Sequence, residues 1–217
     1  RTVVVPISLA QQMFGYGRTI HLLALAGYKD VPSKQVEKAA REAVFARHMI
    51  SPDDEKAAWT MSAGEIGLKD ALCSGSYTVY NRDGANNPEE KRAAELAAYD
   101  CDFFLASTNA ITEDGVMVNV DGYANRASAI AAGPRTVLMI VGMNKVVKHV
   151  EDAFSRARNE AAPINAQRFG VDTPCSKNGM CYDCKSPDTI CCQILITRFS
   201  KIPGRIKVIL VNDELGF

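Results

Sequence analysis

Five of the seven cysteines in this 217-residue chain lie in one short segment, residues 175–192. Gaps of five, two and six residues separate the first four, which are Cys175, Cys181, Cys184 and Cys191. The segment also carries glycine, proline, asparagine and aspartate, which favour turns and predict a loop. Four thiolates on a loop can surround a zinc ion or hold an iron–sulfur cluster. The spacing therefore predicts a metal or cluster site without distinguishing between the two.

Two other interpretations compete with ligation. The cysteines can form disulfides or redox-active thiols, or they can be inert. Secreted disulfide scaffolds are usually small and lack a large core, whereas this chain is long and 47% hydrophobic. The spacing matches neither the paired knuckles of a zinc ribbon nor the bacterial ferredoxin run. We favour ligation, and we interpret Cys192 as a small apolar residue that leads into a strand.

Composition excludes several classes of function. Lysine plus arginine number 25 and aspartate plus glutamate number 25, so no net charge points to nucleic acid or to an anionic membrane. No apolar run approaches the roughly 18 residues of a membrane span, and the first residues lack a secretory signal pattern. We expect a cytoplasmic protein whose cysteines are reduced thiols or ligands.

The elements that must position these residues alternate between strands and helices. Strands are predicted at residues 57–61, 77–80, 102–106, 116–120 and 136–141, and helices at 89–99 and 124–132. This alternation predicts an α/β domain in three layers, with a mainly parallel sheet flanked by helices. Ligands bind such sheets beyond the carboxyl ends of the strands.

Other elements complete the prediction. Residues 18–26 have the composition of a helix that Gly27 ends, and residues 145–162 predict a long amphipathic helix that Pro163 breaks. Residues 194–199 and 206–211 predict an antiparallel closing pair of strands. We divide the chain into an N-terminal helical lobe, residues 1–56, and an α/β domain, residues 57–217.

Polar side chains follow two of the predicted strands. Asp121, Asn125 and Arg126 lie where a strand gives way to a helix N-terminus, which is a ready anion site. Asn144 and Lys145 follow the most apolar strand, where the plainer interpretation is a helix cap beside a solvated lysine. No dinucleotide fingerprint and no flavin site are visible, so the chain shows no complete apparatus for hydride transfer.

Several motifs occur in a fixed order and can be considered together. They occupy residues 108–115, 118–122, 125–126, 141–145, 161–166, 173–191 and 208–216. Together they closely resemble the LUD-domain family of lactate-utilisation proteins, over about residues 60–217. The resemblance implies a fold like that of the phosphosugar isomerases and coenzyme A transferases. In some members it also implies a role in oxidising lactate to pyruvate together with iron–sulfur partner proteins.

The resemblance also implies site residues. Carried over position by position, its polar pocket would use Thr60, Ser62, Asn109, Glu113, Asp121, Asn125, Arg126, Asn144, Lys145, Asn165 and Arg168. Its four-cysteine signature corresponds to Cys175, Cys181, Cys184 and Cys191. Trp59 and Thr60 stand where relatives tend to have glycine and serine. Their larger side chains leave less room for the backbone to approach a ligand at this place.

Three functions follow as hypotheses. The preferred one is a redox-linked accessory or subunit that acts in the oxidation of a small 2-hydroxy acid. Its cysteines would hold a metal or an iron–sulfur centre, and Arg126, Lys145 or Arg168 would bind the acid. The electrons would leave through an iron–sulfur partner protein. The alternative is a standalone isomerase- or transferase-type enzyme on a small anionic metabolite, with Glu113 as base or nucleophile and a structural zinc. The third is a regulatory module with reversible thiols. The sequence leaves open a homo-oligomer and whether the chain is catalytic alone.

Overall fold

A computed structural model describes residues 3–4, 21–26, 56–58, 78–80 and 82–217. Thr60 and Ser62 lie outside these residues, as does most of the predicted lobe at 1–56. The division of the chain at residue 56 therefore stays a prediction.

The larger of two sheets has seven strands. They are β1 (Val3–Val4), β2 (His21–Ala26), β3 (Lys56–Ala58), β4 (Thr78–Tyr80), β5 (Phe103–Ala106), β8 (Thr136–Gly142) and β11 (Ile206–Val211). Their order is β1-β2-β11-β8-β5-β3-β4, and every pairing is parallel except that of β1 with β2. Residues Val137 to Val141 of the central strand β8 are at most 1% exposed. A strand buried on both faces reads as a continuous apolar run, which is why β8 was predictable.

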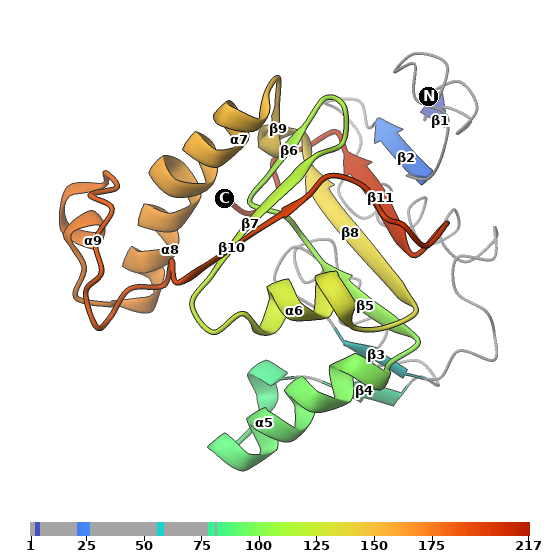
Figure 1. The fold of residues 1–217 in the computed structure, drawn as a ribbon, viewed down its shortest axis with the longest axis horizontal. Helices are drawn as coiled ribbons and strands as arrows, with labels where there is room; N and C mark the ends of the chain where they lie inside the picture. Colours follow the sequence, from blue (N-terminus) through green and yellow to red (C-terminus); the bar gives the residue numbers. More distant parts are fainter. Residues whose placement is uncertain (1–2, 5–20, 27–55, 59–77, 81) are drawn as a thin grey trace.

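The smaller sheet stands in front of the larger one (Figure 1). It contains β6 (Ala110–Thr112), β7 (Met117–Asp121), β9 (Val146–Val147) and β10 (Gln193–Thr197), in the order β10-β7-β6-β9. β6 and β7 form a hairpin in which Gly115 has a φ of 90°, a conformation that favours glycine. The hairpin belongs to the smaller sheet, and β7 contacts the helices at residues 125–132 and 150–156.

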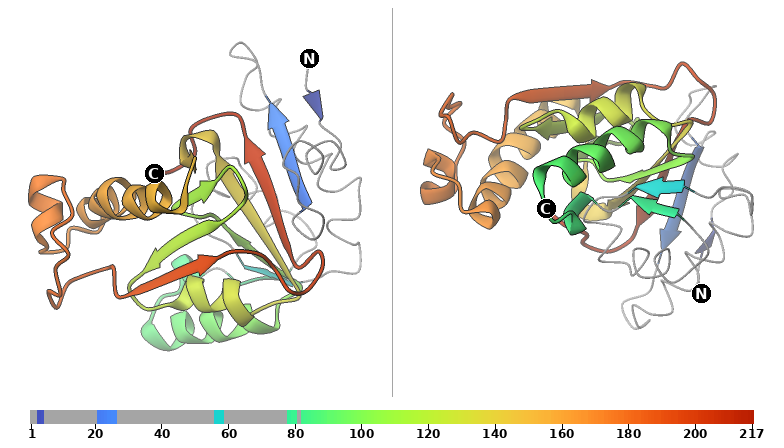
Figure 2. Two further views of the ribbon diagram at one scale, coloured as in Figure 1. Left: turned by 45° about the horizontal axis from the view of Figure 1, so that its top comes forward. Right: turned by 90° about the horizontal axis from the view of Figure 1, so that it is seen from below.

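Helices α5 (Pro88–Ala97) and α6 (Asn125–Ala132) lie side by side against one face of the larger sheet (Figure 2). α5 begins as its sequence predicts, because Asn87 accepts a hydrogen bond of 2.8 Å from the Glu90 N–H and Pro88 is the first helical residue. The predicted α/β class, with a mainly parallel sheet flanked by helices, is confirmed and is consistent with three layers. No helix among the described residues combines the length and apolar character that crossing a bilayer requires.

A helical rod leads away from the sheets towards the cysteine segment (Figures 1 and 2). It consists of α7 (Val150–Arg156), a π-helical turn (Ala157–Ala161) and α8 (Ala162–Phe169), followed by the short α9 (Pro174–Asn178). The prediction that one helix spans 145–162 was wrong at both ends. Val146 belongs to β9, and the rod continues through Pro163. Since the π turn already interrupts the regular hydrogen-bond register, the missing N–H of Pro163 costs little there.

Two further predictions were wrong. Residues 21–26 form strand β2 instead of a helix, because a uniformly apolar run has no period that separates a helix from a buried strand. The last two strands do not pair with each other. β10 pairs antiparallel with β7, whereas β11 lies parallel between β2 and β8. β11 is buried along most of its length and suits a central position, whereas β10 exposes Ile194 and Ile196 and suits an edge.

Candidate functional site

A cluster of polar side chains lies at the carboxyl end of β7. Arg126, in the first turn of α6, places its Nη2 atom 2.6 Å from Oδ1 of Asp121. The same guanidinium donates 2.9 Å hydrogen bonds to Oδ1 of Asn109 and to the Val120 carbonyl. Asp121 also accepts a 2.6 Å bond from the Ala127 N–H, at the start of α6. Three of the predicted site residues, Asn109, Asp121 and Arg126, are therefore brought together and satisfy one another, whereas Asn125, which was grouped with the last two, is not part of the cluster.

Lys145 extends this cluster to the ends of the central strands. Its ammonium nitrogen lies 3.1 Å from Oγ of Ser107, just past β5, and the residue is only 3% exposed. Arg126 donates a longer bond of 3.5 Å to the Ser107 carbonyl. Two cationic side chains, from the ends of β8 and β7, thus meet at Ser107 beyond β5. This is the edge of a parallel sheet at which ligands bind.

Two buried polar residues beside this cluster were not predicted as site residues. Asn119 is 0% exposed, and neither amide atom has a hydrogen-bond partner among the described residues. Because side chains alternate along a strand, it shares a face of β7 with Asp121. Arg156 donates to the carbonyls of Asn144 (3.0 Å) and Asn109, and burial lowers the pKa of its guanidinium while Glu160 opposes that shift. In the sequence, Arg156 falls among the small apolar residues Ala153 and Ala157 of a helical stripe, and this spacing is the signal that could have found it.

Other predicted residues lie elsewhere. Glu113 is exposed in the β6–β7 turn, where its N–H donates to the Val147 carbonyl at 2.9 Å. Asn144 binds the C-terminal segment, donating to the Gly216 carbonyl at 3.0 Å. Arg168 hydrogen-bonds Asn165 at 3.0 Å on the exposed end of α8. Asn125 begins α6, and no described hydrogen bond of its side chain joins it to the cluster.

The cysteine segment lies at the far end of the rod (Figures 1 and 2). Thr173 caps α9 by accepting a 3.4 Å bond from the Ser176 N–H, and its hydroxyl lies 3.3 Å from Sγ of Cys175. An ion pair of 2.7 Å between Lys177 and Asp172 spans the same turn. None of the six described cysteines is in a disulfide.

The four predicted ligands lie near one another. Burial raises the pKa of the Cys191 thiol to about 11, and the neighbouring Cys175, Cys181 and Cys184 add to the rise while Arg158 opposes it. Such mutual effects require the four thiols to be within electrostatic range. No three metal-ligating side chains of the described residues are already arranged as a metal site. Electrostatic interactions reach farther than coordination bonds, so the four thiols are gathered but do not form a closed site.

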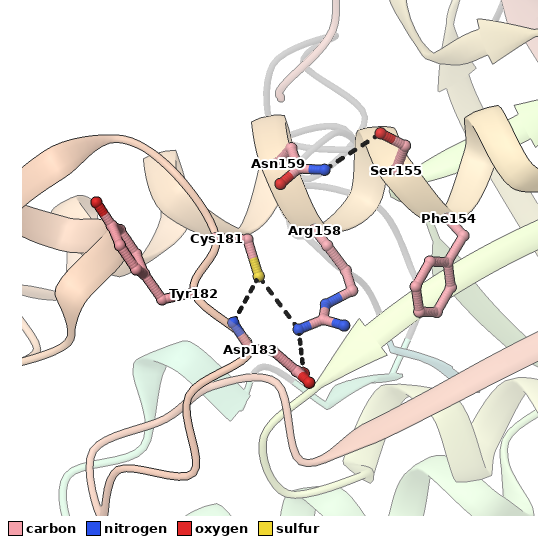
Figure 3. A pocket seen from close by; sticks show the side chains of 7 residues that line it. All are labelled: Phe154, Ser155, Arg158, Asn159, Cys181, Tyr182 and Asp183. Carbon is pink, nitrogen blue, oxygen red and sulfur yellow. Dashed lines mark hydrogen bonds and ion pairs between the residues drawn. The ribbon is translucent and has the colours of Figure 1, made fainter.

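Arg158 joins the cysteine segment to the rod (Figure 3). Its Nη2 atom lies 3.2 Å from Sγ of Cys181 and 2.5 Å from Oδ1 of Asp183. The guanidinium also sits 5.5 Å from the ring centre of Phe154. These groups help to line a pocket of ≈ 370 Å³. Its lining residues are Phe154, Ser155, Arg158, Asn159, Cys181, Tyr182 and Asp183.

The donor types of this segment are of the kind that binds a metal ion or an iron–sulfur cluster. The donor set is four cysteines, and a cation and a backbone N–H, that of Asp183 at 3.4 Å, already point at the Cys181 sulfur. Such donors stabilise the negative charge of thiolate ligands. The buried Nε of Arg158 has no partner among the described residues, which suits a site where a bound group brings further acceptors.

The cysteine segment also touches the end of β7, which carries the polar cluster. A side chain built on Gly122 would lie 3.5 Å from Cα of Ile190, so the backbone next to Asp121 runs beside the backbone next to Cys191. Cys191 itself packs against the small core that contains Val118, Val120, Ala153 and Ala157. The Cys191 end of the cysteine segment therefore lies beside the end of β7.

Comparison with known proteins gives one family. No curated protein matches the chain. Among solved structures, the chain is similar to that of a DUF162 family protein from Deinococcus radiodurans, with 12% sequence identity and a TM-score of 0.32, over 83% of this chain and 99% of that one. The sequence pattern of the LUD domain matches residues 31–211, which is most of the chain. The chain therefore belongs to the LUD domain family.

Proposed function

We propose that this protein is a redox-linked component in the oxidation of a small 2-hydroxy acid, of which lactate is the first candidate. The LUD domain family is associated with lactate utilisation. The observation that carries the proposal is the position of the Cys191 end of the cysteine segment beside the end of β7, where Asp121 and Arg126 lie, with Lys145 reaching Ser107 beyond β5. The proposal links a thiol-rich centre to a cationic cluster that suits a carboxylate.

Cys175, Cys181, Cys184 and Cys191 would hold the metal ion or cluster. An iron–sulfur cluster would supply one-electron transfer, whereas zinc would supply structure alone. The chain's own residues do the rest. Arg158 and the Asp183 N–H orient the Cys181 sulfur, and Thr173 orients the Cys175 sulfur. Electrons would pass to an iron–sulfur partner protein.

The acid would bind near Ser107. Lys145 and Arg126 both reach this residue, so a carboxylate there would meet two cations in a buried setting, where charge interactions are strong. Lys145 is 3% exposed and the side chain of Arg126 is 19% exposed, so we take the more deeply buried Lys145 as the residue that would bind the acid directly.

Purification without air tests the centre. We expect the isolated protein to contain iron and sulfide, with broad visible absorbance, whereas zinc in equimolar amount would support a structural centre instead. Cys184→Ser should lose the metal, whereas Cys192→Ser, a change at an exposed neighbouring thiol outside the set of four, should keep it. A folded wild-type protein that is colourless and free of metal would remove the redox proposal.

Binding of the acid is a separate measurement. Calorimetry with lactate and pyruvate should show binding that Lys145→Met weakens by about tenfold or more, because a charge-assisted hydrogen bond is worth roughly 1.5–3 kcal/mol. Lys148→Met is the matched control, since Lys148 is exposed on the same segment. Equal affinities of the Lys145 variant and the wild type would exclude this pocket.

A standalone isomerase- or transferase-type enzyme is the second candidate. The observation that favours it is the same pair of cations at the strand ends, a buried lysine and a partly buried arginine, which needs no redox centre to bind an anionic metabolite. Here Glu113, which lies in the exposed β6–β7 turn outside the cluster, would have to supply the base or nucleophile. Loss of turnover with retained binding in Glu113→Gln would support that role, and unchanged turnover would exclude it.

A further inference from the structure

We propose that Arg158 is a positioning residue of the four-cysteine centre, which holds Cys181 in place and offsets the charge of the thiolates. The inference rests on the proposed function, since it assigns a role toward the centre that these cysteines would hold. Arg158 is not one of the four ligands, and its role is inferred from the residues that its guanidinium contacts.

The contacts of the guanidinium come from both sides of the junction between rod and cysteine segment. Nη2 meets the Cys181 sulfur at 3.2 Å and the Asp183 carboxylate at 2.5 Å, which are 23 and 25 residues away in the sequence. The Phe154 ring, one helical turn earlier, lies under the guanidinium at 5.5 Å. The side chain is therefore held by charge, by hydrogen bonds and by a cation–π contact at once.

The local backbone explains why an arginine at this position can reach the cysteines. Arg158 is the second residue of the π-helical turn Ala157–Ala161. A π turn adds one residue to the regular repeat and so changes the direction of the side chains that follow it, and such turns occur frequently at functional sites. Ala157 and Ala161 stay buried on the inner face of the rod, whereas Arg158 faces the cysteine segment (Figure 3).

The charge balance gives the residue its function. Four thiolates around a divalent ion carry a net charge of about −2, which a neighbouring cation partly offsets. Arg158 places a guanidinium nitrogen 3.2 Å from the Cys181 sulfur, close enough to offset part of this charge. Its side chain is 19% exposed, so solvent screens it little.

The test uses the whole chain, reduced and stripped of metal by a chelator without air, and titrated with Co²⁺. Thiolate-bound Co²⁺ gives an intense near-ultraviolet absorption, and competition with a chelator gives the affinity. We expect Arg158→Gln to weaken Co²⁺ binding by about 10- to 100-fold, as for other residues that support metal ligands. Arg158→Lys should recover part of the loss, because it restores the charge without the planar fork.

Arg135→Gln, a change at an exposed arginine away from the segment, should bind Co²⁺ like the wild type. Circular dichroism of the metal-free proteins checks that the variants fold. If Arg158→Gln does not fold, the Co²⁺ affinity of Arg158→Lys still tests the inference. Equal affinities of wild type and Arg158→Gln would overturn the inference alone. Equal losses in the glutamine and lysine variants would overturn it too, because charge would then have no part. A wild type without thiolate-bound Co²⁺ would overturn the proposed four-cysteine centre as well.

Discussion

Arg126 folds back from α6 onto Asp121 at the end of β7, with 2.6 Å between Nη2 and Oδ1. The two residues are only five positions apart in sequence, and the pair closes the turn between strand and helix. Asp121 is 9% exposed, and its second oxygen accepts the Ala127 N–H. One carboxylate thus serves both as an ion-pair partner and as a helix cap.

Arg126→Ala should lower the free energy of unfolding by about 3 kcal/mol, because it leaves a largely buried carboxylate without its cation. Urea denaturation followed by circular dichroism measures the loss. Arg135→Ala, at an exposed arginine, should change it by less than about 0.5 kcal/mol. If both variants lost the same small amount of unfolding free energy, the ion pair of Arg126 and Asp121 would not contribute to the stability of the fold.

Arg205 makes a second internal anchor. It donates to the carbonyls of Ala129 (3.1 Å), Ile130 (2.6 Å) and Pro134 (3.0 Å), which ties the start of β11 to the end of α6, and burial lowers its pKa. Arg205→Met should destabilise the fold by about 3 kcal/mol, because three buried carbonyls lose a charged donor. Lys201→Met, on the exposed loop before it, is the control. A thermal melt within about 2 °C of the wild type for Arg205→Met would contradict this account.

Replacement of Asn119 by an apolar residue should stabilise the fold. Its amide is fully buried without a described partner, so it bears a desolvation cost that no described hydrogen bond offsets. Asn119→Leu, of similar shape, should raise the free energy of unfolding by about 1–2 kcal/mol in the absence of metabolite. Chemical denaturation measures the change. A clear loss of stability would mean instead that the amide is bound within the native protein.

The raised pKa of Cys191 gives a pH dependence. The thiol titrates near 9.0 when unperturbed and at about 11 in the folded chain, so the folded state favours the protonated form. The stabilisation is complete below pH 9.0 and is lost as the pH rises through about 11. Metal-free, reduced Cys191→Ala should therefore lose less stability across this window than the wild type does. Cys192→Ala should follow the wild type, and parallel curves for all three proteins would contradict the prediction.

If the four cysteines bind a metal as proposed, its removal should loosen the cysteine segment and leave the sheets folded. The segment contacts the rod at its far end, whereas the core lies around β8 and β11. After treatment with a chelator, trypsin should cut at Lys177 and Lys185, while circular dichroism changes little. Mass spectrometry of the fragments with and without chelator measures the effect. Identical cleavage in both conditions would show that nothing bound by the cysteines orders this segment.

Local signals were enough for the central elements. β8 is an unbroken apolar run, and α5 has an asparagine cap followed by proline, so both followed from neighbouring residues alone. The predictions failed where partners decide the outcome. Residues 21–26 are apolar without a period, and only pairing with β11 makes them a strand. β10 and β11 are close in sequence, yet burial places one at an edge and the other at the centre.

The same division applies to the candidate site. Spacing alone singled out the four cysteines, because crowded thiols on a turn-rich loop have few explanations, and a strand end singled out Asp121 with Arg126. Their neighbours could not be predicted. Arg158 meets Cys181 from within a π turn and across 23 positions of sequence, and the approach of Ile190 to Gly122 depends on how the segment returns to β10. The sequence determined which residues can do chemistry, whereas only the tertiary structure decided which of them meet, because contacts between distant residues depend on how whole elements pack.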